Sequence, residues 1–206
     1  MQAITDLIMY FHKGGLVMWP LLACSITVIA IAIERFIYYK SVDSGAAFAS
    51  HYCAAVRSGD FAVATELARK CSGQCAQMLA DVEAVAGGKA EKSAFLESRA
   101  GIFMATLRDK LDYLGIIVTM SPLLGLLGTI VGMIGAFSIF NVEAGAPMAI
   151  TGGIGEALIA TATGLCVAIL SLCAHSYFAH RMDNMITDME QCFSALLEAE
   201  TRRARS

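Results

Sequence analysis

The chain has 206 residues, of which 57% are hydrophobic and 16% are charged, and its mean hydropathy is +0.62. Because soluble domains usually carry about 25% charged residues, this balance excludes an ordinary soluble domain and predicts several membrane spans. The net charge of −3 is mild and no basic face appears, so no nucleic-acid partner is expected.

The N-terminal segment, residues 1–15, is expected to form an amphipathic helix outside the membrane. Its apolar side chains recur at the i, i+3, i+4, i+7 spacing of one helical face: Ile4, Leu7, Ile8 and Phe11. Such a helix lies in the membrane interface or packs against a neighbouring subunit. Gly14 and Gly15 would then form the corner into the membrane.

The first membrane span is predicted over residues 16–39, since a spanning helix needs about 20 mostly apolar residues. A cleaved signal peptide is not expected, because Lys13 is the only basic residue before the run and the run is too long. Glu34 and Arg35 also follow the apolar residues where a cleavage site would be expected.

Residues 40–113 are predicted to form a cytoplasmic helical bundle. The segment is rich in alanine and helical periods and carries no nucleotide-binding loop, which favours a structural role over a catalytic domain. From residue 90 to 110 nothing interrupts the helical pattern, so one long helix should run into the second span. The seven cysteines form no CxxC motif, so we expect free thiols and no metal site.

Two further spans are predicted over residues 114–140 and 150–178, joined by a short periplasmic loop at 141–149. The short connection predicts an antiparallel hairpin. Residues 179–206 keep an apolar helical stripe, so the third span should continue as a cytoplasmic C-terminal helix. The predicted fold class is therefore an all-α integral membrane protein with three transmembrane helices, whose long helices extend into the cytoplasmic bundle.

The orientation follows from the basic residues that flank the spans. The connection 141–149 contains no lysine or arginine, whereas Lys40, Arg108, Lys110 and Arg181 lie directly beside the spans on the other side. The positive-inside rule places the N-terminus in the periplasm and the C-terminus in the cytoplasm.

Small residues line one face of each of the last two spans and predict close helix packing, because backbones can approach where side chains are small. The candidates for helix packing are Gly125, Gly128, Gly132, Gly153, Ala157 and Gly164.

Glu156 lies in the third span, which contains no other acidic or basic side chain apart from His175 near its far end. An ionisable side chain inside a span costs on the order of 2.5–3.5 kcal/mol and usually marks a pathway, a relay or an ion pair. Reflecting the hairpin about Gly145 puts Thr129 level with Thr161, with Glu156 five residues, about 7.5 Å, nearer the outside. Thr163 lies seven residues after Glu156, on the same helical face.

This arrangement predicts a proton pathway made of Glu156, Thr129, Thr161 and Thr163, in which the carboxylate loads a proton and hydroxyls or waters pass it inward. Three alternatives stay open. Glu156 could be a structural carboxylate, its oxygens and the hydroxyls could bind sodium, and each threonine could bond only to its own helix. No nucleophile–base pair or metal-ligand set occurs in the spans, so no catalytic or metal site is predicted.

The chain closely resembles the MotA/TolQ/ExbB proton-channel family, and ExbB most of all. The resemblance rests on FHKGGLVMWPLLACSITVIAIAIER (residues 11–35), SPLLGLLGTIVG (121–132) and GGIGEALIATATGL (152–165), together with the insertion between the first two spans. It implies that Glu156 is the family's essential carboxylate and that Thr129 and Thr161 are its pore-lining threonines. Thr163 falls where the family pattern is usually apolar, so it ranks below Thr161.

The resemblance further implies a bacterial inner-membrane homo-oligomer, a pentamer, whose pore holds the single-span helices of an ExbD-like dimer. That complex would convert proton motive force into mechanical work on a TonB-like periplasmic protein, with a transported proton and no cofactor. A TolQ-like role in envelope maintenance is the near alternative. A MotA-like role is disfavoured because the fourth span of that branch is absent. From another class, the chain could be a non-conducting membrane scaffold with a structural Glu156.

Overall fold

The computed structural model describes residue 11 and residues 14–142 and 147–203, with 139–142 and 147–150 described by their backbone alone. The predicted N-terminal amphipathic helix lies almost entirely outside the described residues. Within these ranges every regular element is helical, which confirms the all-α fold class. The elements are α2 (Met18–Val42), α3 (Ala46–Ser58), α4 (Phe61–Lys70), α5 (Gln74–Asp81), the 3-10 helix η1 (Val82–Ala84), α6 (Lys89–Val142) and α7 (Pro147–Arg203).

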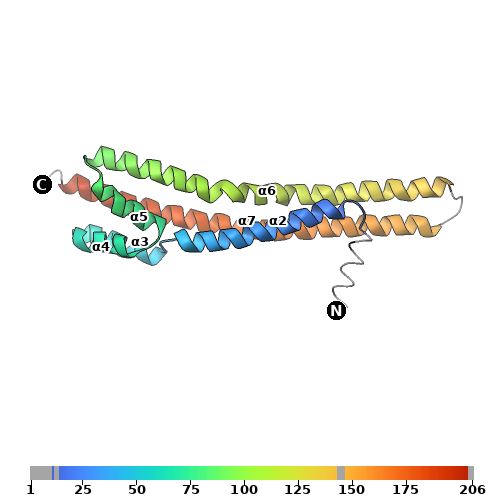
Figure 1. Ribbon diagram of the computed structural model, residues 1–206, viewed down its shortest axis with the longest axis horizontal. Helices are drawn as coiled ribbons and strands as arrows, with labels where there is room; N and C mark the ends of the chain where they lie inside the picture. The colour runs from blue at the N-terminus through green and yellow to red at the C-terminus, as the bar shows by residue number, and fades with distance from the viewer. Residues whose placement is uncertain (1–10, 12–13, 143–146, 204–206) are drawn as a thin grey trace. The chain divides into compact units, whose positions relative to one another are not determined.

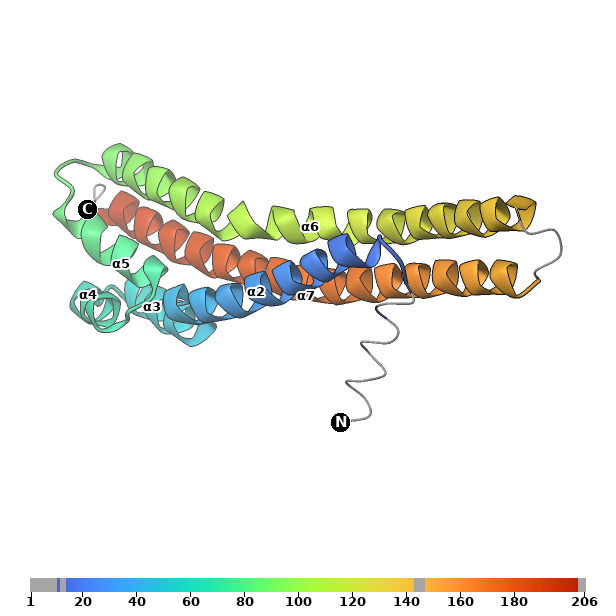
Figure 2. The same ribbon diagram turned by 45° about the vertical axis from the view of Figure 1, so that its right-hand side comes forward.

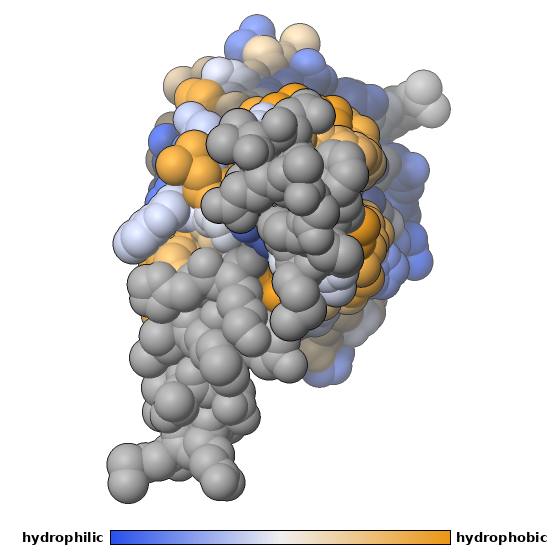
Figure 3. Space-filling view, turned by 90° about the vertical axis from the view of Figure 1, so that its right-hand side faces the viewer, coloured by the Kyte–Doolittle hydropathy of each residue, from blue (hydrophilic) through white to orange (hydrophobic). Residues whose placement is uncertain are grey.

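Three stretches of the described chain are long and apolar enough to cross a membrane: Met18–Ser58, Lys89–Ser138 and Thr151–Arg203. Only 22%, 28% and 33% of their apolar windows are buried within the chain. Many large hydrophobic side chains therefore face outward, as the orange residues on the visible face in Figure 3 show. Such a surface requires lipid or other protein chains around it.

The long helices are continuous, as predicted. α6 passes through Pro122 without a break and α7 runs past His180 to Arg203. Both are drawn as unbroken coils in Figure 1. The predicted loop at 141–149 is shorter in the structure, because α6 ends at Val142 and α7 begins at Pro147. The residues between these two helix ends lie outside the described ranges.

The chain divides into two compact units. The hairpin unit comprises Met1–Ile33 and Asp112–Ser176, and the helix-cluster unit comprises Glu34–Leu111 and Tyr177–Ser206.

In the hairpin unit, α6 and α7 lie side by side with opposite chain directions (Figures 1 and 2). Two side-chain hydrogen bonds join them directly: the Thr161 hydroxyl donates to the Gly125 carbonyl at 3.0 Å, and the Ser171 hydroxyl donates to the Leu114 carbonyl at 2.9 Å. The start of α2 also belongs to this unit. There Val17, Met18 and Leu21 are buried, and Leu124 of α6 packs against them.

The helix-cluster unit is a bundle in which α3 packs on α4 and α4 on α5. Gly59 ends α3, because its φ of 84° is a left-handed conformation that favours glycine. Asp60 then caps the start of α4 by accepting a hydrogen bond from the Val63 N–H at 3.2 Å. The core includes large side chains that are almost fully buried: Val56, Leu79, Val82, Leu96, Leu107 and Met189.

Arg35 ties α2 to α6 inside the helix-cluster unit. Its side chain is only 4% exposed, and its guanidinium donates to the Thr106 carbonyl at 3.0 Å and to the Glu34 carboxylate at 2.8 Å. The Tyr39 hydroxyl donates to the neighbouring Leu107 carbonyl at 3.0 Å. These contacts join helices far apart in sequence at the point where the apolar run of α2 ends.

Candidate functional site

Glu156 lies on the half-buried side of α7, in the hairpin unit. Its carboxylate packs against Gly15, in the turn that leads into α2. A Cβ atom added at position 15 would fall on the Glu156 Oε1 atom, so the carboxylate occupies the space that a side chain there would need. The structure thus brings together two residues that are 141 positions apart in the sequence.

Thr161 links the two long helices. Its hydroxyl lies 3.0 Å from the Gly125 carbonyl of α6 and 3.3 Å from the Ala157 carbonyl of its own helix. The two other candidate threonines donate only within their helices, Thr129 to the Leu126 carbonyl at 2.6 Å and Thr163 to the Ile159 carbonyl at 2.9 Å. Each hydroxyl hydrogen is therefore directed to a backbone oxygen.

The four predicted pathway residues do not form one hydrogen-bonded chain within the described part of the protein. No hydrogen bond joins Glu156 to Thr129, Thr161 or Thr163 there. Glu156 faces the α2 corner, whereas Thr161 faces α6. Any proton transfer between them needs intervening water or a partner side chain.

The register of the hairpin differs from the one expected by reflection about Gly145. Thr161 faces Gly125, four residues before Thr129 on α6. The reflection treats the helices as straight and parallel, whereas close contacts between small residues decide the register in the structure. Gly132 meets the Gly153 carbonyl and Ala157, and Gly128 meets Ala160.

All six predicted packing residues lie at the contact between α6 and α7. A Cβ atom added to Gly128 would be 2.5 Å from the Ala160 Cβ, and one added to Gly132 would be 3.1 Å from the Gly153 carbonyl oxygen. At Gly164 the added atom would be 2.6 Å from the Ser121 carbonyl oxygen. The backbones therefore approach so closely that no larger side chain fits without movement.

Two serines at this contact were missed by the sequence reasoning. Ser171 is fully buried and bonds Leu114, and Ser121 is fully buried with a hydroxyl that has no hydrogen-bond partner among the described residues. A signal was available, because Ala157, Gly164 and Ser171 repeat at seven-residue spacing, the period of a helix seam.

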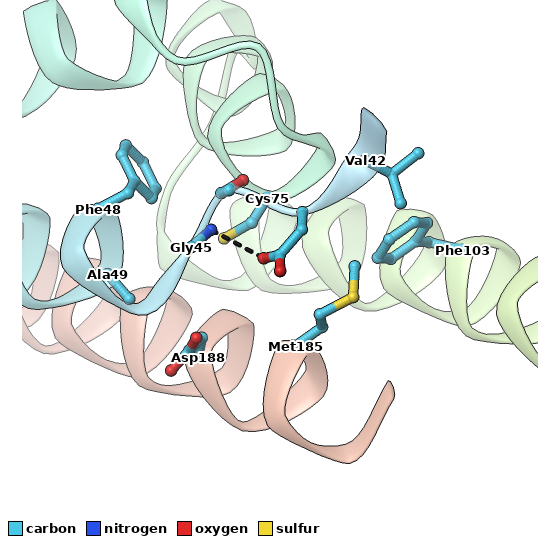
Figure 4. Close-up of a pocket in the computed structure, with 10 residues that line it drawn as sticks. Val42, Gly45, Phe48, Ala49, Cys75, Phe103, Met185 and Asp188 are labelled. Carbon is cyan, nitrogen blue, oxygen red and sulfur yellow. Dashed lines mark hydrogen bonds between the residues drawn. The ribbon is translucent and has the colours of Figure 1, made fainter. Parts of the chain in front are cut away.

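The helix-cluster unit contains a small cavity lined by residues of several helices (Figure 4). Asp43 accepts from the Gly45 N–H at 2.8 Å on one side, and Asp188 lies on α7. Burial, and then the nearby Asp43, raise the pKa of the Asp188 carboxyl. The cavity holds about 10 Å³, about what one water-sized sphere needs, so it is too small for a substrate.

Two cysteines of this unit, Cys53 and Cys192, are not activated nucleophiles. Burial raises the pKa of the Cys53 thiol to about 11, and a contact with Cys75, followed by burial, raises the pKa of the Cys192 thiol. Both thiols stay protonated at neutral pH, whereas a reactive cysteine needs a thiolate. Among the described residues no group of His, Cys, Asp and Glu is arranged to hold a metal ion.

Comparison with known proteins places these features in a family. The model of the MotA/TolQ/ExbB proton channel family matches residues 74–191. An ExbB-like biopolymer transport protein of Synechocystis sp. (ExbB-like 1) is 34% identical over 170 residues, covering 79% of this chain and 66% of that protein, just under two thirds of its length.

Two further relatives extend the comparison. Biopolymer transport protein exbB1 of Vibrio cholerae is 27% identical over 183 residues, covering 85% of this chain and 80% of that protein. Tol-Pal system protein TolQ of Pseudomonas aeruginosa is 36% identical over 81 residues, covering 39% of this chain and 35% of that protein. The ExbB matches thus cover far more of this chain than the TolQ match does.

Proposed function

Because this chain belongs to the MotA/TolQ/ExbB proton channel family, we propose that it is an ExbB-like stator subunit of the inner membrane. With an ExbD-like single-span partner it converts proton motive force into mechanical work for TonB-dependent transport across the outer membrane. The broad matches to proteins named as ExbB support this branch. In this role the chain is not an enzyme, and it moves protons without a cofactor.

The working complex is a homo-oligomer, a pentamer, with the helices of an ExbD-like dimer in its pore. The apolar surface on α2, α6 and α7 supports an assembly embedded in lipid, because most of it is unburied within one chain. The basic residues beside the spans support a periplasmic N-terminus and a cytoplasmic C-terminus. A TonB-like protein receives the force on the periplasmic side.

Glu156 is the proton-loading group in this proposal. The observation that carries it is a half-buried carboxylate on an otherwise apolar helix segment, for which the described residues provide no salt-bridge partner. A membrane carboxylate without a fixed counter-charge can gain and lose a proton during turnover. Thr129, Thr161 and Thr163 provide oxygen atoms along the route, and the partner's side chains or water complete it.

The test is proton flux through the chain co-purified with its single-span partner and reconstituted in vesicles with a pH-sensitive dye inside. Glu156→Gln should assemble normally while the flux falls about a hundredfold or more, as for the loss of a group that transfers protons. Glu190→Gln, the same change at an exposed position of α7, is the matched control and should conduct normally.

Undiminished proton flux in Glu156→Gln would refute the proposal and favour a scaffold with a structural carboxylate. Flux driven by a sodium gradient and absent without sodium would instead identify sodium as the coupling ion. The local TolQ match supports a second candidate, a subunit that energises envelope maintenance. The two candidates separate in a deletion strain, which would lose receptor-dependent uptake in the first case and outer-membrane integrity in the second.

A further inference from the structure

The turn before α2 has a backbone that favours glycine at one position. Gly15 adopts φ 71°, in the left-handed region that residues with a Cβ rarely adopt. The first turn of α2 starts here, since the Met18 N–H donates to the Gly15 carbonyl at 3.2 Å and the Trp19 N–H donates to the Leu16 carbonyl at 3.4 Å. The first N–H groups of a helix have no acceptors within the helix, and they give its amino end partial positive charge.

This corner packs on the turn of α7 that carries Glu156. The Glu156 carboxylate takes up the side-chain space of Gly15, and a Cβ atom added at Gly14 would lie 3.3 Å from the Ile159 Cγ2 atom. Val17, the next buried residue, approaches Gly128 of α6. The corner is therefore packed against both helices of the hairpin rather than only beside Glu156.

We propose that Gly15 is a positioning residue for Glu156. Without a side chain, and with φ in the left-handed region, Gly15 lets the carboxylate lie against the amino end of α2, whose charge complements it. The corner covers part of the half-buried carboxylate, so it limits the directions from which a proton or a partner group reaches Glu156. The consequence for transport rests on the proposed function, whereas the contact itself does not.

Gly15→Ala tests the proposal, and the chain offers a matched control. Gly59 also has a left-handed backbone, with φ 84°, but a Cβ atom added there would meet nothing within 4 Å. Gly15→Ala and Gly59→Ala therefore share the backbone penalty, and only the first displaces the Glu156 carboxylate. A difference between the two variants reports the contact and not the strain.

The readout is the rate at which dicyclohexylcarbodiimide, a membrane-soluble reagent for carboxyl groups, labels position 156 in the complete complex, followed by peptide mass spectrometry. Gly15→Ala should raise the rate several-fold by pushing the carboxyl out of the corner, and Gly59→Ala should leave it unchanged. Glu156→Asp shortens the side chain and makes room. In that background Gly15→Ala should have little further effect on labelling.

A second measurement leaves Gly15 unchanged, in case Gly15→Ala does not accumulate. In Glu156→Ala, hydrogen exchange of the backbone amides of Met18 and Trp19, which donate to the Gly15 and Leu16 carbonyls, should become several-fold faster, because the carboxylate no longer holds the corner. Thr163→Ala, about two helical turns from Glu156 on the same face of α7, should leave that exchange unchanged.

The inference would be overturned if Gly15→Ala were labelled at the wild-type rate, or if Gly59→Ala changed labelling as much as Gly15→Ala does. Unchanged hydrogen exchange in Glu156→Ala would also overturn it. Failure of the proposed function would look different: Glu156→Gln would conduct normally while the effect of Gly15→Ala on labelling remained.

Discussion

At the scale of single residues, the three candidate pathway threonines of the hairpin unit differ in their hydrogen bonds. Thr161 reaches across to the Gly125 carbonyl, whereas Thr129 and Thr163 return to carbonyls of their own helices. A hydrogen bond between helices contributes to assembly of the hairpin, and one within a helix does not. The threonines therefore differ in their structural role even though all three hydroxyls are satisfied.

Thr161→Val should lower the free energy of unfolding by about 0.6 kcal/mol, and by no more than about 1.7 kcal/mol, the range measured for hydrogen bonds between membrane helices. Valine keeps the shape and removes only the hydroxyl. Thr163→Val is the matched control and should change stability less, because its bond stays within α7. The measurement is denaturant-induced unfolding in mixed micelles. Equal losses in both variants would show that the bond to Gly125 adds nothing.

At the scale of helices, small residues decide how α6 meets α7. Gly164 lies against the Ser121 carbonyl and Gly125, and Gly153 lies against Ala136 and the Gly132 carbonyl. Without a hydrophobic drive between helices in lipid, such close packing is a main source of association. Other positions on the same helices are open, since a Cβ atom added to Gly155 or Gly135 would meet nothing within 4 Å.

Gly164→Ala should therefore separate the helices and destabilise the hairpin by about 1–3 kcal/mol, the usual cost of overpacking. Gly155→Ala, on the same helix but open, should be neutral or stabilising by up to about 1 kcal/mol, since alanine is the better helix former. Thermal unfolding of the two purified variants, followed by circular dichroism, makes the comparison. If Gly164→Ala were as stable as Gly155→Ala, the close approach of Gly164 to the Ser121 carbonyl would be contradicted.

At the scale of the whole molecule, three helices each run through both compact units. α2 passes from the hairpin unit to the helix-cluster unit at Glu34. α6 contributes to the helix-cluster unit before Asp112 and to the hairpin unit after Leu111, and α7 passes from one to the other at Tyr177. No separate linker joins the units along these helices.

The proposed topology predicts the behaviour of fusions at the C-terminus. Green fluorescent protein fused after Ser206 should fluoresce, because it folds in the cytoplasm, whereas alkaline phosphatase at the same place should be inactive. A fusion of alkaline phosphatase after Gly145 serves as the opposite control and should be active. Active phosphatase at the C-terminus would contradict the orientation inferred from Lys40, Arg108 and Arg181.

The helices were predictable from local signals, whereas the contacts of the candidate site were only partly so. Apolar runs and unbroken periodicity predicted the continuity of α6 and α7, because these features act within a few turns of one helix. Glu156 stood out by its charge alone. Its contact with Gly15 depends on how α2 enters the hairpin, and the pairing of Thr161 with Gly125 depends on the crossing of two helices. Neither is encoded by spacing along one segment.

The direction of the threonine hydroxyls has a consequence for ion selectivity. Because Thr129, Thr161 and Thr163 all donate to carbonyl oxygens, they present lone pairs and no free hydrogen to the surrounding space. Lone pairs solvate any small cation, hydronium and sodium alike. In the proposed proton pathway, discrimination between the two depends on Glu156, since a carboxylate can form a covalent O–H bond with a proton and only an ionic contact with a metal ion.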